Sequence, residues 1–181
     1  MSMIGSTLIN DIVNRFRIFT PSKILATLDK EITEALNQGS EDEERSNDGM
    51  DIVVCEINTK TNLIRFASAM RPVIFYNKGE RFYIRGNRSS VGGEIIQEKV
   101  FDDQEYHLQK GDVIYMFSDG YPDQFGGPLG KKFKMARMKT LLDGVQGKSM
   151  QEQYDYIKNN FDLWRKDYEQ VDDVLFMGIK I

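Results

Sequence analysis

The sequence contains very little cysteine or histidine, with one of each among its 181 residues. A single cysteine excludes a disulfide framework within the chain and is typical of a reducing compartment. Cys55 lies in an apolar strand pattern without a basic neighbour that would lower the pKa of its thiol, so we expect a core residue rather than a nucleophile. No apolar run approaches the roughly 20 residues that a membrane-spanning helix requires.

The chain also lacks an excess of positive charge. It has 24 Lys and Arg residues against 28 Asp and Glu residues, which gives a net charge of -4 and argues against a nucleic-acid or anionic-membrane surface. Met1 leads into an amphipathic segment without a basic region, so we expect no signal peptide and a cytoplasmic location. A hydrophobic content of 40% and a charged content of 29% predict a soluble globular protein, with residues 1–181 forming one domain.

Apolar residues at helical spacing predict two helices in the first forty residues. The first covers Ile4 to Phe16 in one continuous stripe. The second begins at Thr20-Pro21, an N-cap residue followed by proline at the first helical position, and ends near Gly39. The acidic stretch Ser40 to Asn47 contains no apolar residue, which indicates an exposed loop.

Short runs rich in Val, Ile, Phe and Tyr then predict strands. They cover residues 51–57, 63–69, 73–76 and 81–84, with weaker signals at 96–101 and 106–108. Turn residues separate these runs, so we expect an antiparallel meander. The run Val113 to Phe117 is apolar throughout, which is typical of a central strand covered on both faces.

The C-terminal third is predicted to contain a loop, two helices and a final strand. The loop covers Tyr121 to Lys132, and the second helix begins with a capping box, Ser149 with Glu152. The apolar stripe of this second helix, expected to face the core, consists of Met150, Tyr154, Ile157, Phe161 and Trp164. The final strand covers Val174 to Ile181. The order of elements predicts an α+β layered domain around an antiparallel sheet or sandwich.

Acidic residues stand beside two of the predicted strands. Ser118-Asp119-Gly120 follows the central strand, Asp123 lies in the loop after it, and Asp172-Asp173 precedes the final strand. Strands that end in carboxylates hold hard cations on a rigid scaffold, so the pattern favours a metal-dependent hydrolytic site. The alternative is a pair of ordinary turns, since Ser, Asp and Gly are turn residues. Adjacent carboxylates repel each other, however, and a cation or a basic neighbour would relieve that repulsion.

These segments resemble the motifs of a known family. Residues 115–123 resemble the "FSDG" motif of metal-dependent Ser/Thr protein phosphatases, in the bacterial branch named after stage II sporulation protein E, and residues 171–175 resemble the closing "DD" motif of that branch. Further similar segments are residues 47–51, 66–69, 124–127 and 169–170. The resemblance implies an α+β fold, an antiparallel β-sandwich flanked by helices in αββα layers, here without its N-terminal strands.

The resemblance also implies roles for the acidic residues. Asp119 and Asp172 would bind the same one of two Mn²⁺ or Mg²⁺ ions, and Ser118 and Gly120 would belong to the site loop. Asp123 falls where some members have a carboxylate near a further, looser metal, and Asp173 replaces Asp172 if the alignment shifts by one residue. No other catalytic side chain is expected, because a hydroxide bridging the two metals acts as the nucleophile.

Two N-terminal motifs of the family are absent: an early Gly-Asp strand motif and the motif that supplies the bridging metal ligand. The bridging ligand comes from an Asp-x-Thr/Ser-Gly-His-Gly motif that normally precedes a stretch like residues 1–5 of this chain, so we expect the C-terminal portion of a longer protein with an incomplete, weakly binding metal site. His107 cannot replace the motif, since an ordinary surface or edge position is expected for it. Met70 and Arg71 stand where the branch often has small polar residues.

Three functions follow from these observations. The first is a phosphoprotein phosphatase in bacterial signalling, acting on a phosphorylated anti-sigma-factor antagonist or a similar regulator. A sensor domain would precede it, so it could be the cytosolic output domain of a membrane-bound sensor. The second is a non-catalytic interaction module with the same fold, and the third is a stand-alone divalent-cation binder. The sequence upstream of Met1 discriminates between the first two. Missing strands would leave a sheet edge uncovered, which favours a homodimer.

Overall fold

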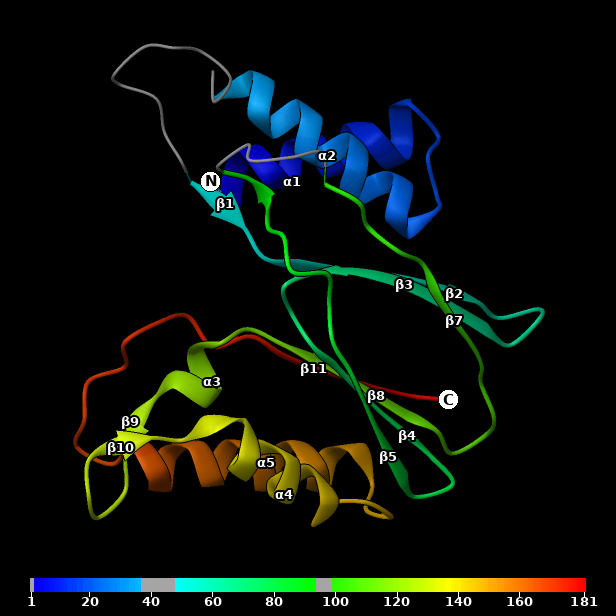
Figure 1. Ribbon diagram of the computed structural model, residues 1–181. Helices are drawn as coiled ribbons and strands as arrows, with labels where there is room; N and C mark the ends of the chain where they lie inside the picture. The colour runs from blue at the N-terminus through cyan, green and yellow to red at the C-terminus, as the bar shows by residue number, and fades with distance from the viewer. Residues whose placement is uncertain (1, 37–47, 94–98) are drawn as a thin grey trace. The chain divides into compact units, whose positions relative to one another are not determined.

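The computed structural model describes residues 2–36, 48–93 and 99–181 (Figure 1). The chain divides into two compact units, each formed from two separate segments of the sequence. Unit 1 comprises Met1–Pro72 and Ile84–Gln109, and unit 2 comprises Val73–Tyr83 and Lys110–Ile181. No helix among the described residues is long and apolar enough to cross a membrane.

Two helical segments open unit 1. The α-helix α1 (Ser2–Asn10) continues directly into a π-helical turn, η1 (Asp11–Arg15), so the predicted single stripe from Ile4 to Phe16 is interrupted. The wider turn changes the register of the side chains, and Ile12 becomes completely buried. The periodicity predicted the helix but could not reveal the change in winding.

Helix α2 (Pro21–Ala35) begins as predicted but ends earlier than predicted. Thr20 is at the N-cap position with an extended backbone (φ -70°, ψ 120°), yet its side chain makes no capping hydrogen bond. The first turn instead uses Asp103, whose Oδ1 accepts from the backbone N–H of Ser22 at 2.8 Å. Gly39 and the loop of residues 40–47 lie outside the described residues.

The sheet of unit 1 is antiparallel and has the order β2-β3-β7. Its strands are β2 (Ile52–Asn58), β3 (Leu63–Ala69) and β7 (Gln104–His107). Helix α2 packs on this sheet, and the buried residues between them include Leu25, Leu28, Ile32, Ala67 and Ala69. A short ribbon of β1 (Gly49–Met50) and β6 (Val91–Gly92) was not predicted.

The predicted meander is wrong at one point, because β3 does not continue into a neighbouring strand of its own sheet. Met70 adopts a left-handed conformation (φ 65°), and the N–H of Arg71 donates to the carbonyl of Ala69 at 2.8 Å. This tight turn sends the chain into unit 2, and β3 pairs with β7 instead. The predicted strand at 96–101 is also wrong where it is described, since residues 99–101 are irregular and 94–98 lie outside the described residues.

Unit 2 contains an antiparallel sheet with the order β11-β8-β4-β5. Its strands are β4 (Val73–Asn77), β5 (Glu80–Ile84), β8 (Val113–Phe117) and β11 (Phe176–Lys180). The apolar run of β8 is a central strand, as predicted, and lies between β4 and β11. The pairing of β8 with β11 extends from Phe117↔Phe176 to Val113↔Lys180.

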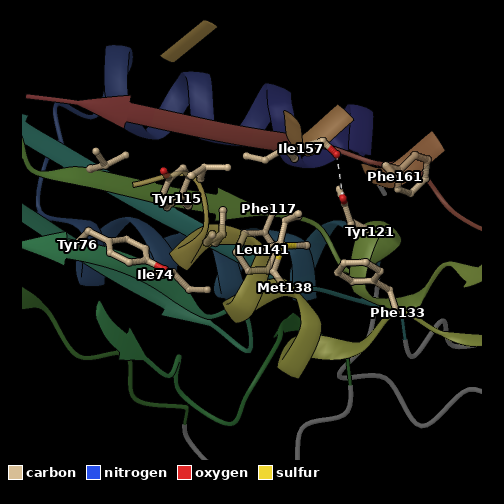
Figure 2. Packing of buried hydrophobic residues seen from close by; sticks show 13 residues of the cluster. Ile74, Tyr76, Tyr115, Phe117, Tyr121, Phe133, Met138, Leu141, Ile157 and Phe161 are labelled. Atoms are coloured by element: carbon tan, nitrogen blue, oxygen red, sulfur yellow. Dashed lines mark hydrogen bonds between the residues drawn. The ribbon is translucent and has the colours of Figure 1, made fainter. Parts of the chain in front are cut away.

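Helices α4 (Lys134–Asp143) and α5 (Met150–Arg165) supply most of the remaining core of unit 2 (Figure 2). The predicted capping box is confirmed, because Ser149 and Glu152 exchange side-chain and backbone hydrogen bonds. Tyr154 was predicted to face the core but is 59% exposed, and it lines a groove between α5 and β11. The apolar stripe of α5 therefore predicted the buried face of this helix correctly, except at Tyr154.

The predicted loop after Gly120 contains three short elements. They are the helical turn α3 (Gly120–Asp123) and the two-residue strands β9 (Phe125–Gly126) and β10 (Lys131–Lys132). Trp164 fastens this hairpin to α5: its carbonyl accepts from Gly127 N–H at 2.8 Å, and its Nε1–H donates to the carbonyl of Gln124 at 3.0 Å. Strands this short leave no periodic signal in a sequence. The α+β class itself, with antiparallel sheets and helices, is confirmed.

The core of unit 2 provides a test of this packing. Leu142 on α4 is completely buried, so Leu142→Ala is expected to lower the free energy of unfolding by about 2–5 kcal/mol through lost contacts and an internal cavity. Urea unfolding followed by circular dichroism measures the change. The control Leu129→Ala, at a side chain that is 76% exposed, should change stability by less than about 0.5 kcal/mol. Equal effects of the two substitutions would contradict the assigned core.

Candidate metal centre

The first acidic segment lies where β8 ends. Phe117 is the last residue of the strand, and Asp119 already has helical dihedral angles (φ -74°, ψ -15°) at the N-cap of α3. The carbonyl of Asp119 accepts from the N–H of Asp123 at 2.8 Å, which closes the helical turn. Pro122 fits this first turn because proline needs no hydrogen-bond partner for its nitrogen. Asp119 is therefore held at a sharp change from strand to helix, and it is only partly exposed.

The second acidic segment, Asp172-Asp173, lies against this turn. The backbone N–H of Ser118 donates to the carbonyl of Leu175 at 3.0 Å. The hydroxyl of Ser118 donates to the carbonyl of Asp173 at 2.8 Å and accepts from the N–H of Leu175 at 3.0 Å. The structure thus brings together the two segments that the sequence singled out, and one backbone hydrogen bond and two hydrogen bonds of the Ser118 hydroxyl hold them.

Gly120 allows the close approach of these segments. A Cβ atom at this position would lie 2.4 Å from the carbonyl oxygen of Asp173 and 2.9 Å from its carbonyl carbon. Contacts this short do not occur for real Cβ atoms, and both atoms belong to backbone that cannot rotate away. Glycine is required here because of its small size.

The segment before β11 has hydrogen bonds of its own. The Oδ1 atom of Asp172 accepts from the N–H of Asp173 at 2.7 Å, and the Nε2 atom of Gln170 donates to the carbonyl of Asp172 at 2.9 Å. Gln124, which is completely buried, donates from Nε2 to the carbonyl of Glu169 at 2.8 Å. The side chains of Asp172 and Asp173 are exposed, so their carboxylates face solvent while their main chain is fixed.

Asp123, the third candidate, has a cationic partner within the chain. The Nζ atom of Lys132 lies 2.9 Å from its Oδ2 atom. Lys132 comes from β10, so the hairpin predicted as a loop supplies this contact. Its ammonium group partly balances the charge of the Asp123 carboxylate.

The described residues supply the type of donor atom that a divalent cation prefers, but too few donors for a complete site. Asp119 and Asp172 offer the hard oxygen donors that Mg²⁺ and Mn²⁺ prefer. Within residues 2–36, 48–93 and 99–181, however, no three His, Cys, Asp or Glu side chains gather as a group that could hold a metal ion. These ions prefer about six ligands, so two carboxylates form only part of a site.

The histidine and the cysteine do not add to the donor set. His107 is exposed at the end of β7, an edge strand of the unit 1 sheet, as expected from the sequence. Burial, together with the charge of neighbouring Glu56, raises the pKa of the Cys55 thiol to about 11. A thiol with this pKa is almost entirely protonated at neutral pH, so Cys55 is not an activated nucleophile.

The sequence does not predict the contacts that three residues make near the site. Gln124 and Trp164 anchor the segments on either side of the acidic turn, and Lys132 contacts Asp123. Gln124 was noted only within a similar segment, and its isolated position gave no sign of complete burial. The Gly-Gly pair after it was the available signal, since Trp164 packs where the side chains of residues 126 and 127 would be.

A family model and several solved structures match this chain. The model of the family described as "Stage II sporulation protein E (SpoIIE)" matches residues 1–181. The SiaA-PP2C domain of Pseudomonas aeruginosa has a similar structure, with a TM-score of 0.86 and 20% identity over 99% of this chain and 68% of that chain. No curated protein matches.

Two further solved structures share the fold. The PP2C phosphatase domain of SpoIIE from Bacillus subtilis, solved with a fragment of its regulatory domain, gives a TM-score of 0.69 at 20% identity over 98% of this chain. This chain spans 48% of that one. RsbX, solved in complex with magnesium, gives a TM-score of 0.58 at 15% identity over 96% of this chain and 71% of that chain. The chain therefore has the fold of PP2C phosphatase domains.

The contact at Gly120 leads to a prediction. Gly120→Ala is expected to lower the free energy of unfolding by about 1–3 kcal/mol, because the backbone of Asp173 must move to admit the methyl group. Gly144→Ala is the matched control, because an added Cβ atom there would lie 3.5 Å and 3.6 Å from its nearest neighbours and the backbone is helical. Urea unfolding of both variants measures the difference. An effect of Gly120→Ala no larger than that of Gly144→Ala would contradict the close contact.

Proposed function

Because this chain belongs to the family of stage II sporulation protein E (SpoIIE), we propose that it forms part of a metal-dependent phosphatase domain that removes phosphate from Ser or Thr residues of a signalling protein. One observation supports this more than any other. The turn of Asp119 and the segment of Asp172-Asp173, far apart in sequence, are held together at the end of β8 by hydrogen bonds from Ser118. The family model also matches the chain from end to end.

In this proposal Asp119 and Asp172 contribute carboxylates to a Mn²⁺ or Mg²⁺ site, with Asp173 as the alternative to Asp172. A divalent metal supplies charge that neutralises phosphate oxygens and activates a water molecule, so that no phosphoenzyme is needed. The residues of this chain fix the two acidic segments and keep their carboxylates at the surface. The donor set is incomplete within the described residues, which predicts weak metal binding by this chain.

The partners follow from the proposed reaction. The substrate would be a phosphorylated regulatory protein, such as an anti-sigma-factor antagonist, in the cytoplasm of a bacterium. A sensor domain would control the phosphatase, and the B. subtilis SpoIIE structure includes part of a regulatory domain beside its phosphatase domain. No nucleic-acid partner is proposed, given the net charge of -4.

A non-catalytic interaction module is the second candidate. It is favoured by the lack of any three-residue metal-ligating group within the described residues. The nucleotide sequence upstream of Met1 distinguishes the two functions. An in-frame Asp-x-Thr/Ser-Gly-His-Gly motif there would support the phosphatase, and its absence would support the interaction module.

The phosphatase proposal predicts the outcome of a phosphate-release assay. With Mn²⁺ and a phosphoserine peptide, the 181-residue chain should release no phosphate above the buffer rate, because its donor set is incomplete. If the upstream motif exists, the extended chain should be active, and Asp119→Asn should lower its activity by about 100-fold or more, beyond the 10–100-fold typical of outer-shell partners. Asp167→Asn, an exposed residue outside the site, should retain activity.

Two results would contradict these expectations. Strong turnover by the 181-residue chain that disappears in Asp119→Ala would show that its metal site is complete. An extended chain that carries the motif but releases no phosphate would overturn the phosphatase proposal.

The edge of the unit 2 sheet supports a proposed homodimer. Leu175 and Ile181 form backbone hydrogen bonds with Ser118 and Asp112, the residues that flank β8, each at 3.0 Å. Because bonding direction alternates along an antiparallel strand, Phe176, Gly178 and Lys180 direct their backbone groups to the opposite side of β11. Among the described residues no strand pairs with that side. Two copies of the chain could pair there about a two-fold axis.

A proline substitution tests this dimer. Lys180→Pro removes one outward-directed N–H from each copy while sparing the bonds to β8, so the dissociation constant of the dimer should rise about tenfold through two lost hydrogen bonds. Lys180→Ala keeps the N–H and should leave the constant unchanged. Light scattering over a concentration series provides the measurement. A wild-type monomer at about 100 μM, or equal dimerisation of both variants, would count against the proposal.

A further inference from the structure

Ser118 makes a contact that a residue in a regular strand does not make. Opposite residues in a hydrogen-bonded antiparallel pair exchange two bonds, each N–H donating to the carbonyl of the other. Ser118 and Leu175 form the first of these, from Ser118 N–H to Leu175 O at 3.0 Å. For the second, Leu175 N–H donates to the hydroxyl oxygen of Ser118 at 3.0 Å. The hydroxyl thus replaces the backbone carbonyl, and the chain can turn into α3 without losing the last bond of the ladder.

The same hydroxyl also binds the acidic segment directly. It donates to the carbonyl oxygen of Asp173 at 2.8 Å. A hydroxyl has one donor and two acceptor positions, so both bonds can form at once. Gly120 lies against the same carbonyl group from another direction, with room for a hydrogen atom only. The main chain of Asp173 is therefore fixed by a hydrogen bond and by a steric contact.

This arrangement has a consequence for the charges. The two segments both carry acidic side chains, Asp119 on one and Asp172 and Asp173 on the other, and like charges that are brought close together repel each other. The contacts of Ser118 and Gly120 are uncharged, so they can hold the segments together without a cation. Preorganised supports of this kind raise the affinity of a site because less of the binding energy is used for ordering it.

We propose that Ser118 is a positioning residue, whose hydroxyl sets the placement of the Asp172-Asp173 segment against the turn that carries Asp119 before a cation binds. Nothing in the family match or the structural comparisons assigns this role. The proposal rests on the proposed metal function of Asp119 and Asp172, but the placement itself can be measured on the metal-free chain.

The experiment compares the wild-type chain with Ser118→Ala and Ser118→Thr. Ala removes both hydroxyl bonds, whereas Thr keeps a hydroxyl that can form them. Hydrogen exchange followed by NMR on the metal-free chain should show the amide of Leu175 exchanging about tenfold or more faster in Ser118→Ala and at close to the wild-type rate in Ser118→Thr. Urea unfolding of each variant identifies any general loss of stability, which would raise exchange throughout the core of unit 2.

The second measurement is Mn²⁺ affinity, from the EPR signal of free Mn²⁺ during a titration. Ser118→Ala should raise the dissociation constant about tenfold, as for other groups that orient ligands, and Ser118→Thr should restore it to within about twofold. Unchanged Leu175 exchange in Ser118→Ala, or exchange that changes while Mn²⁺ affinity does not, would overturn the positioning role. A wild-type chain that binds no Mn²⁺ at about 10 mM would overturn the proposed metal function instead, and Leu175 exchange would still decide whether the hydroxyl places the segment.

Discussion

Strand β11 enters the sheet of unit 2 through β8, along a ladder from Phe117↔Phe176 to Val113↔Lys180. This pairing joins the middle of the chain to its C-terminus. It also stacks the ring of Phe176 on that of Phe117, with centroids 5.4 Å apart, in the core that includes α4 and α5. Without the ladder, the segment of Asp172-Asp173 would have no fixed position relative to Asp119. The fold of this unit and its candidate site thus depend on one set of backbone hydrogen bonds.

The placement of charge follows from that dependence. Acidic side chains lie at the surface, where water screens them, while uncharged hydrogen bonds from the backbone and the hydroxyl of Ser118 determine where their main chain runs. Lys132 moderates the charge of Asp123 from the β10 strand. Tyr121, one residue beyond Gly120, anchors the turn to α5, because its hydroxyl donates to the carbonyl of Ile157 at 2.9 Å (Figure 2). An acidic site can therefore be built on a rigid apolar base.

The sequence predicted the elements whose signals are local. The apolar run of β8 and the capping box at Ser149 depend only on neighbouring residues, and the structure confirms both. The metal-binding roles of Asp119 and Asp172 come from a family motif and stay a prediction. The change of sheet after β3 depends on a left-handed Met70, a conformation that a non-glycine residue rarely adopts, so nothing in the local pattern indicated it. The contacts of Lys132 and Gln124 are likewise tertiary, and isolated polar residues give no sign of their partners.

The contacts of Trp164, which hold the β9–β10 hairpin against α5, have a practical consequence. Trp164 is the one tryptophan of the sequence, and it binds the backbone of Gln124 and Gly127 while the guanidinium of Arg137 lies 4.6 Å from the centre of its ring. The tryptophan fluorescence of the protein therefore comes from this one site, where the hairpin meets α5 next to the acidic turn. Intrinsic fluorescence of the unmodified protein would follow local events at that junction in real time.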